Sequence, residues 1–368
     1  MRALLALVLL ASPLALAGPA RVITGSETEG LTPQAAAVDI NGWSLMDYSE
    51  HVLGINIQAV RTIIDAQEVA VAAGTPEAYE AWLKHAHAAC VDAIARIEAT
   101  PGWEGDTSIT EEVAKNWRWL QGKLEGDFPE MFALLFKEDV TNADLERVEA
   151  ITRTMDAETA ALVARADQLQ RDFAKRHKAV LIESSEEAAL TDEIEEMTTS
   201  TFSHPGLPPE GSVLEPEIHV SFATRYHNQL VARQVAMMDA LNGFIDATQA
   251  GGDAVEDARV AALKAVQAEV KAAKRAEDWQ GDAGLREGLV AFGEELEGVL
   301  EGHFAEYTAR VGKKRLSAKD ADLANEHAAA ADEAISEALQ GFGQAQTAFQ
   351  ERWGMLAFEA WVRENEGM

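Results

Sequence analysis

Apolar residues recur every three or four positions along most of this chain, a spacing typical of amphipathic helices, whereas the alternation typical of strands is nearly absent. Glycine and proline gather between these stretches. The pattern predicts four helices in each half of the chain, over residues 45–72, 76–99, 107–137 and 142–182, then 219–248, 253–276, 283–313 and 318–355. Because short connections favour antiparallel neighbours, the sequence predicts an all-α fold of two tandem antiparallel four-helix bundles.

The second predicted bundle repeats the first. Residues 103–177 align without a gap on residues 279–353, which lie 176 positions later, and 19 of the 75 aligned pairs are identical. A repeated sequence is expected to bury a repeated core, so this pattern predicts an internal duplication. The apolar stripe of residues 145–173 recurs at 321–349, and a large side chain in one copy often corresponds to a small one in the other.

Polar residues near the predicted helix starts also recur. Thr141 and Ser317 each put a hydroxyl at the start of a helix, and an aspartate follows three residues later, which satisfies free amide groups and complements the helix dipole. Asp106 and Asp282, which end the aligned Trp-x-Gly-Asp segments, are predicted to cap the preceding helices. These four residues are the predicted helix caps.

The same patterns divide the chain into six parts. Arg2 precedes an apolar run that closes on Ala15-Leu16-Ala17, the layout of a cleaved signal peptide over residues 1–17. An extended segment follows at 18–43, and Trp43 is expected to hold its end against the first bundle. The bundles take residues 44–182 and 218–356, an acidic linker rich in proline and glycine takes 183–217, and a tail takes 357–368.

The signal peptide predicts export to a periplasm, a cell surface or the medium, and no later stretch reaches the roughly 20 apolar residues of a transmembrane segment. The 31 basic and 62 acidic residues give a net charge of −31, which repels phosphate backbones, so nucleic-acid binding is set aside. Cys90 is the only cysteine, so no intramolecular disulfide can form. It is predicted to be a small buried hydrophobe, with a reactive thiol as the alternative.

Residue patterns that carry familiar chemistry are missing. None of the histidines has an acidic residue three positions before it, as a di-metal bundle requires, and no Cys-x-x-Cys-His segment could attach haem. No nucleophile elbow or glycine-rich phosphate loop occurs. The sequence therefore predicts no catalytic or metal-binding residue and no cofactor. His87 and Cys90 can share a helix face, and His327 is expected to be either a buried, hydrogen-bonded imidazole or a ligand contact.

Four charged positions among those that both copies share are the candidate functional positions. They are Glu125, Glu130, Asp156 and Arg176, with Glu301, Glu306, Asp332 and Arg352 at the aligned positions. Arg176 is expected to pair across the bundle with Glu125 or Glu130, and such pairs would either fix the register of the helices or form a ligand site. The shared glycines Gly122 and Gly126 are expected to allow close approach of a neighbouring helix, or else to form a groove.

Three segments of the chain resemble the motifs of a family of bacterial surface proteins of unknown function, first named from spirochaete surface proteins. They are Trp103-Glu-Gly-Asp106, Gly122-Lys-Leu-Glu-Gly-Asp-Phe-Pro-Glu-Met131 and Phe173-Ala-Lys-Arg-His177. The resemblance covers residues 45–182 well and 219–355 more weakly. It implies two copies of an all-helical exported domain that opens with a Tyr-led helix, here at Tyr48. It implies no catalytic residues, and this signal peptide lacks a cysteine that could carry a lipid.

Together these features predict an exported, non-enzymatic helical protein that presents helix surfaces to an unknown protein partner in the cell envelope or at the cell surface. The alternative is a periplasmic bundle protein that holds a small ligand or a metal. Phe358 and Trp361 in the tail are expected either to dock on their own bundle or to form a peptide that binds the partner.

Overall fold

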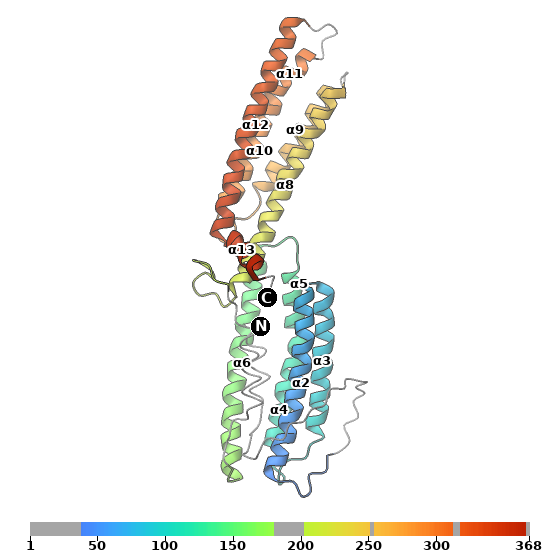
Figure 1. Cartoon of the computed structure of the whole chain (residues 1–368), viewed down its shortest axis with the longest axis vertical. Coiled ribbons are helices and arrows are strands. Elements are labelled where there is room, and N and C mark those ends of the chain that lie inside the picture. Colours follow the sequence, from blue (N-terminus) through green and yellow to red (C-terminus); the bar gives the residue numbers. More distant parts are fainter. Residues whose placement is uncertain (1–37, 180–201, 251–253, 312–316, 366–368) are drawn as a thin grey trace. The chain divides into compact units, whose positions relative to one another are not determined.

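The computed structural model describes residues 38–179, 202–250, 254–311 and 317–365, and over these ranges the chain folds into helices without a β-strand (Figure 1). The prediction of an all-α fold is confirmed for these residues. The predicted signal peptide lies outside them, as do residues 18–37 of the extended segment and 183–201 of the linker. None of the helices in the described ranges is long and apolar enough to cross a membrane.

The chain divides into two compact units. Unit 1 comprises residues up to 137 together with 147–201, and unit 2 comprises 138–146 together with 202–368. The sequence placed 138–146 in the first bundle, and this was wrong. In unit 2, Asn142 Nδ2 donates to the Asp278 carbonyl over 2.7 Å, and Asn142 Oδ1 accepts from Gln280 N over 2.9 Å. Helical periodicity carries no information about such contacts, because they are made by a single polar side chain.

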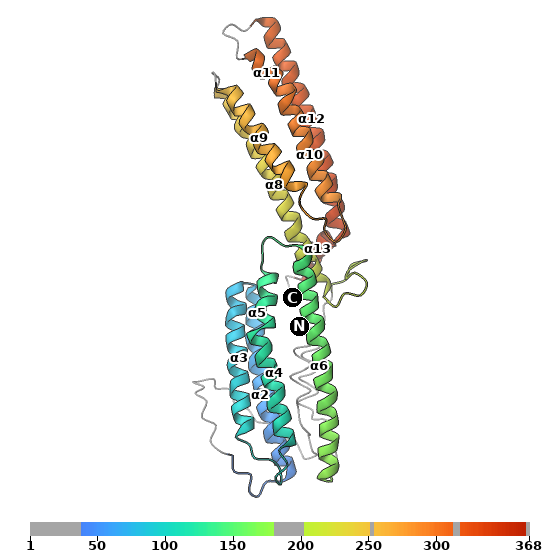
Figure 2. The same cartoon turned by 180° about the vertical axis from the view of Figure 1, so that it is seen from behind.

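Unit 1 contains α2 (Leu45–Ala73), α3 (Pro76–Glu98), α4 (Ser108–Glu125), α5 (Asp127–Leu135) and most of α6 (Asn142–Arg176). α2 packs along α3 and α3 along α4. α6 lies next to α4 and meets it through side chains, as in the ion pair of Lys123 with Glu158 (Figure 2). The core gathers around Trp82 of α3, which is 2% exposed. Its ring lies 5.6 Å from that of Phe128 and 5.7 Å from that of Phe132, so α5 is held by aromatic contacts with α3.

Unit 2 contains α8 (Pro216–Ala250), α9 (Val255–Ala273), α10 (Gly284–Glu301), α11 (His303–Val311), α12 (Ala318–Arg352) and α13 (Met355–Asn365). α8 packs along α9, α9 along α10, and α12 along both α10 and α11. The Phe244 and Phe304 rings lie 4.9 Å apart, which joins α8 to α11 in the core. Ser317 is the N-cap of α12, and its side chain accepts from Asp320 N over 3.1 Å. Thr141 Oγ1 likewise accepts from Asp144 N over 3.3 Å at the start of α6.

The helices α10, α11 and α12 begin and end 176 positions after α4, α5 and α6. In both places the structure divides a helix that the sequence predicted to be continuous, at Gly126 and at Gly302. Gly126 N closes the last turn of α4 on a carbonyl of that helix, and Gly126 O accepts the first bond of α5 from Glu130 N over 3.3 Å. Leu124 and Phe128 are buried on either side of the break. Because the apolar pattern continues across Gly126, the break could not be predicted from that pattern.

The second half of the predicted linker is folded, which corrects the sequence. Phe202 is 5% exposed, and its ring lies 5.1 Å from that of Phe358 and 5.9 Å from that of Trp361. These two residues belong to α13, so the tail docks within unit 2. A Cβ on Gly354, which has φ +69°, would lie 3.0 Å from the His204 ring. The linker was predicted from the acidic composition of the segment, and apolar residues such as Phe202 were given no weight in that prediction.

The shared glycines of α4 and α10 do not bring helices together, contrary to the first expectation from sequence. A Cβ built on Gly122 or Gly298 meets nothing within 4 Å. The close-packed glycines are others, Gly288 and Gly293 of α10. A Cβ on Gly293 would lie 2.3 Å from Val270 Cγ2 of α9. The sequence missed this contact because only glycines common to both copies were singled out.

We expect Gly293→Ala to lower the free energy of unfolding of unit 2 by about 1–3 kcal/mol, because the new methyl group overlaps Val270 and Met237. The matched control is Gly298→Ala on the same helix, which has open space and should instead raise that free energy by up to about 1 kcal/mol. Chemical denaturation measures both. Equal effects of the two substitutions would contradict the packing described for α10.

Candidate binding cleft between α4 and α6

A tight turn precedes α4, over Trp103-Glu104-Gly105-Asp106. Glu104 has φ +49° and Gly105 has φ +85°, and Asp106 N donates to the Trp103 carbonyl over 2.8 Å. Two successive left-handed residues are what a type I′ turn requires, and glycine adopts this conformation without steric cost. The turn before α10 repeats this geometry, with φ +49° at Gln280 and +76° at Gly281. The left-handed backbone conformation at this position therefore explains why both turns have a glycine there.

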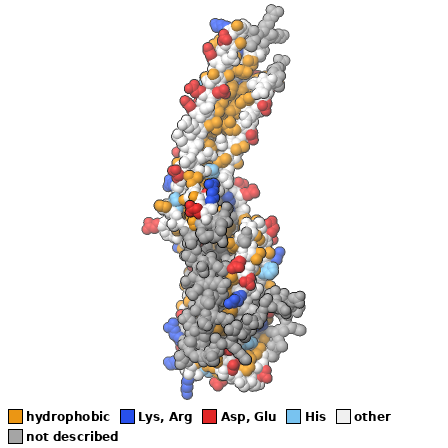
Figure 3. All heavy atoms as spheres, in the orientation of Figure 1, with side chains coloured by type: hydrophobic (Ala, Val, Ile, Leu, Met, Phe, Trp, Pro, Cys, Tyr) orange, Lys and Arg blue, Asp and Glu red, His pale blue; other side chains and the backbone are white. Residues whose placement is uncertain are grey.

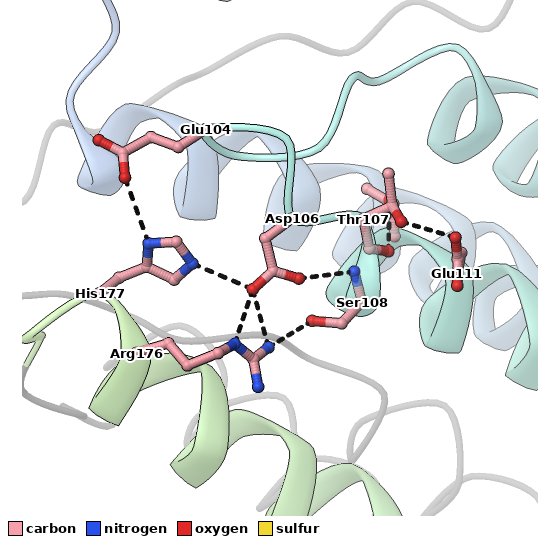
Figure 4. A network of polar contacts seen from close by, with 8 residues as sticks. Glu104, Asp106, Thr107, Ser108, Glu111, Arg176 and His177 are labelled. Carbon is pink, nitrogen blue, oxygen red and sulfur yellow. Dashed lines mark hydrogen bonds and ion pairs between the residues drawn. The ribbon is translucent and has the colours of Figure 1, made fainter.

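The aspartate that ends each turn joins the start of one helix to the end of another, and Figure 4 shows the connection that Asp106 makes. Asp106 Oδ1 accepts from Ser108 N over 3.0 Å, at the start of α4. Asp106 Oδ2 accepts from Arg176 Nε over 2.9 Å and from His177 Nε2 over 3.0 Å, at the end of α6. Burial raises the pKa of the Asp106 carboxyl, but hydrogen bonds from Ser108, His177 and Arg176 outweigh it and hold that pKa well below its ordinary value.

The aligned residues of unit 2 make the same connection with different chemistry. Asp282 Oδ1 accepts from Gly284 N over 3.0 Å, and Asp282 Oδ2 lies 3.3 Å from Arg352 Nη1. The indole Nε1 of Trp353 donates to that same Oδ2 over 3.2 Å. Trp353 aligns with His177, so an indole N–H in one unit takes the place of an imidazole N–H in the other.

Two predictions from sequence are corrected by this geometry. Arg176 pairs with Asp106 rather than with Glu125 or Glu130, because antiparallel packing brings the end of α6 beside the start of α4. Asp106 and Asp282 bind the first amide groups of the helices that follow them, not of the helices that precede them. The sequence offered many carboxylates as partners for Arg176, and only the turn geometry selects among them.

Further ion pairs join α6 to α4 and α5 along their length. Arg165 pairs with Glu112, and Lys123 Nζ lies 2.8 Å from Glu158 Oε2. Near the start of α6, the Arg147 guanidinium donates through two nitrogens to Glu130, each over 2.7 Å. Such two-pronged contact favours one orientation of the two helices.

A cleft of about 660 Å³ opens between these helices. It is lined by Arg118, Trp119, Gly122, Lys123 and Asp127, and on α6 by Glu158, Ala161, Leu162 and Arg165. At its centre Lys123 Nζ lies 2.7 Å from Asp127 Oδ2 and 5.5 Å from the centre of the Trp119 ring. Trp119 Nε1 donates to Glu158 Oε2 over 2.7 Å.

The charges at the centre of the cleft stabilise one another. Burial lowers the pKa of Lys123, but hydrogen bonds to Asp127 and Glu158 outweigh it, and the pKa is raised. The hydrogen bond from Lys123 is the main cause of the lowered pKa of Glu158, to which Trp119 also contributes. Both groups are therefore charged at neutral pH.

α4 and α6 contain buried polar atoms without hydrogen-bond partners in the described ranges. They are Glu112 Oε1 and Asn116 Oδ1 on α4 and Thr159 Oγ1 on α6, in residues 8%, 4% and 5% exposed. Glu112 and Asn116 also line a second cavity between the helices, of about 10 Å³. That volume is about what one water molecule requires.

The aligned interface of unit 2 is apolar and closely packed. Glu112, Asn116 and Thr159 correspond to Gly288, Phe292 and Ile335, and Arg165 corresponds to Gly341. A Cβ on Gly288 would lie 2.6 Å from Ala345 Cβ of α12, so the two helices are in direct contact there. The rings of Phe292 and Phe342 lie 5.9 Å apart. The two units therefore share the aspartate connection and differ in the interface beyond it.

The other shared charged residues do not assemble into a site. Glu125 Oε1 lies 2.8 Å from His87 Nε2 in an exposed contact, and Glu306 pairs with Arg310 on its own helix. Asp156 is half-buried, and Glu301 and Asp332 are exposed. The cleft residues were missed because identity between copies was the criterion, whereas the cleft is where the copies differ. The sequence did contain a sign of the cleft, because Trp119 and Lys123 correspond to residues of a different type, Glu295 and Val299.

The sequence favoured a buried Cys90 over a metal site shared with His87, and the burial of Cys90 is confirmed. Cys90 is fully buried, which raises the pKa of its thiol to about 12, and His87 faces Glu125 instead. His327 is half-buried, with its Nδ1 3.5 Å from Nδ1 of His303. Over the part of the chain that the structure describes, no group of three or more His, Cys, Asp and Glu side chains could hold a metal ion.

No family model, no curated protein and no solved structure matches this chain. The resemblance to the bacterial surface-protein family therefore stays a prediction from sequence.

We expect Asp106→Asn to lower the free energy of unfolding of unit 1 by about 1–3 kcal/mol at neutral pH, because charged hydrogen bonds to Arg176 and His177 are lost. The pKa of Asp106 is depressed in the folded state, so its stabilising contribution is complete above about pH 4 and is lost as the pH falls further. The gap between wild type and variant should close in that acid range, as followed by chemical denaturation at a series of pH values.

The matched control is Asp167→Asn on α6, which removes an exposed carboxylate that pairs with Arg171. It should change the free energy of unfolding by less than about 0.5 kcal/mol. If both variants lost the same stability, or if the gap for Asp106→Asn widened in acid, the role given to Asp106 would be wrong.

Proposed function

We propose that this protein is an exported, non-enzymatic binding protein of two helical bundles related by duplication, and that unit 1 holds a ligand in the cleft between α4 and α6. Duplication is supported by the common offset of α4 to α6 and α10 to α12, and by the repeated turn with its aspartate. Export is supported by the composition of residues 1–17. The envelope or surface location is supported by the family resemblance.

The contrast between the two aligned interfaces carries the proposal. In unit 2, apolar side chains fill the aligned interface. Helices arranged in this way can therefore pack together without leaving a cleft. Unit 1 instead keeps a cleft of about 660 Å³ lined by charged side chains. Beside the cleft, Glu112 Oε1 and Asn116 Oδ1 have no partner in the described ranges and line a cavity with room for about one water molecule. Stability alone would favour the unit 2 solution, so the open, polar interface of unit 1 is best explained by ligand binding.

The cleft is suited to binding rather than to catalysis. Its central lysine has a raised pKa and its central glutamate a lowered one, so neither exchanges protons readily near neutral pH. General acid–base catalysis works best when the pKa of the catalytic group lies near the working pH. Lys123 and Glu158 instead form a fixed ion pair in the lining of the cleft.

A second candidate function is the presentation of a helix face to an envelope partner. It is favoured by the band of apolar side chains on the face of unit 2 that Figure 3 shows. Val235 of α8, a large apolar residue, is 49% exposed. The version in which the tail binds the partner is not favoured, because Phe358 and Trp361 pack against Phe202.

Native mass spectrometry with an absorbance spectrum, on protein purified from its own host, tests the proposal. Gly122→Trp should fill the cleft, because its Cβ points into open space, and Gly298→Trp is the matched substitution in unit 2. We expect wild type and Gly298→Trp to carry excess mass or an added absorbance, and Gly122→Trp to lack it. The chain mass also reports whether residues 1–17 have been removed.

Bare chain mass in all three proteins would contradict ligand binding in the cleft and would favour the second candidate. Cross-linking in the cell envelope would then identify the partner. Excess mass that persists in Gly122→Trp would place the ligand elsewhere in the molecule.

A further inference from the structure

We infer that the ligand of the cleft is an organic anion, a carboxylate or a phosphate ester, with an apolar body. This inference rests on the proposed function, because it concerns the same cleft. It follows from the charge of the residues that line the cleft, from the remaining N–H donors of its two guanidinium groups and from its apolar lining residues.

The nine residues that line the cleft have a charge balance opposite in sign to that of the chain, and the carboxylates that pair with its two arginines, Glu98 and Glu112, lie outside the lining. The nine lining residues include three cations and two carboxylates, a balance of +1, whereas the whole chain carries −31. The nine aligned residues of unit 2 include Glu294, Glu295 and Glu337 and no lysine or arginine, a balance of −3 with histidine neutral. A strongly acidic protein repels anions in general, so a local excess of cations is needed to bind one.

Arg118 and Arg165 are the groups that can receive the anion. Their side chains are 53% and 46% exposed, and each pairs with a glutamate, Glu98 or Glu112, through Nη2. A guanidinium carries five N–H donors in a planar fork, so further donors remain for a carboxylate or a phosphate. The Arg118–Glu98 pair is exposed and contributes little to stability, so a ligand anion can share or replace it at small cost. Arg165 keeps its buried partner Glu112 and offers its remaining donors.

Lys123 does not compete for this role, because Asp127 and Glu158 hold it at 2.7 and 2.8 Å. The same contacts disfavour a cationic ligand. The two carboxylates that would attract one are already occupied by an ammonium group of the chain. What remains accessible in the cleft is a pair of guanidinium groups and apolar surface.

The apolar surface selects the body of the ligand. Trp119 turns its N–H toward Glu158, and this bond fixes the indole ring at the wall of the cleft. Gly122, Ala161 and Leu162 also line it, and Gly122 leaves open space where another residue would have a side chain. The volume of about 660 Å³ is within the range of small-molecule sites. An aromatic or alkyl body fits this environment.

Isothermal titration of the purified mature chain with three probes of one shape tests the inference: naphthoate, naphthylmethanol and naphthylmethylammonium. We expect naphthoate to bind at least tenfold more tightly than the neutral alcohol, and the cation to bind most weakly. Naphthyl phosphate in place of naphthoate distinguishes a phosphate site from a carboxylate site. The preference for the anion should shrink as ionic strength rises, because salt screens exposed charges.

Arg118→Gln should remove most of the preference for naphthoate and leave the affinity for the alcohol unchanged. The double variant Glu112→Gln with Arg165→Gln should have the same effect as Arg118→Gln. Both residues are changed together so that no buried carboxylate is left unpaired. Arg171→Gln, an exposed arginine on α6 that pairs with Asp167, is the matched control and should bind as wild type does. Gly122→Trp should abolish binding of every probe, and Gly298→Trp should not.

The outcomes separate the two levels of the proposal. Equal binding of alcohol and anion, with loss of both in Gly122→Trp, would overturn the anionic ligand and leave the cleft as a binding site. If the cation bound most tightly, the anionic ligand would likewise be overturned and the cleft would remain a binding site. If no probe bound in a way that depends on Gly122, both the ligand class and the cleft would be refuted.

Discussion

The bond between a turn aspartate and the end of a long helix is the constraint on which each unit depends. In unit 1 the Asp106 carboxylate accepts hydrogen bonds from an amide of α4, from the Arg176 guanidinium and from the His177 ring, so one side chain joins the start of α4 to the end of α6. The turn itself holds the aspartate at the start of α4. This contact sets the register of α6 against α4 at that end, and the ion pairs of Glu112 with Arg165 and of Lys123 with Glu158 continue it along the two helices.

Beyond that anchor, the two units join their helices by different forces. α12 meets α10 through apolar side chains and closely approaching backbones, and apolar burial with close packing is the strongest source of stability available to a protein. α6 meets α4 through ion pairs that are partly open to solvent and that contribute less. The same anchor thus supports a closed core in unit 2 and an accessible interface in unit 1. Duplication would allow this division, since one copy can lose packing while the other keeps it.

The helical periodicity of the sequence predicted the helices within a few residues, because burial of one apolar face is a local property of the chain. It did not reveal the breaks at Gly126 and Gly302, since the apolar face continues through them. The partner of Arg176 could not be chosen from sequence, because many carboxylates lay within plausible reach. The cleft was missed for another reason: residues that differ between copies were given no weight, although Trp119 and Lys123 mark the difference.

Asn142 bears on how this protein could be divided. It is the first residue of α6, most of which belongs to unit 1, and yet it fastens the backbone of Asp278 and Gln280 in unit 2. Unit 2 is therefore discontinuous along the chain. A single cut between residues 179 and 202 would not release two complete folding units, because the C-terminal fragment would leave behind the residue that satisfies these two backbone groups. The aligned halves of the sequence and the compact units of the folded protein are therefore not the same segments.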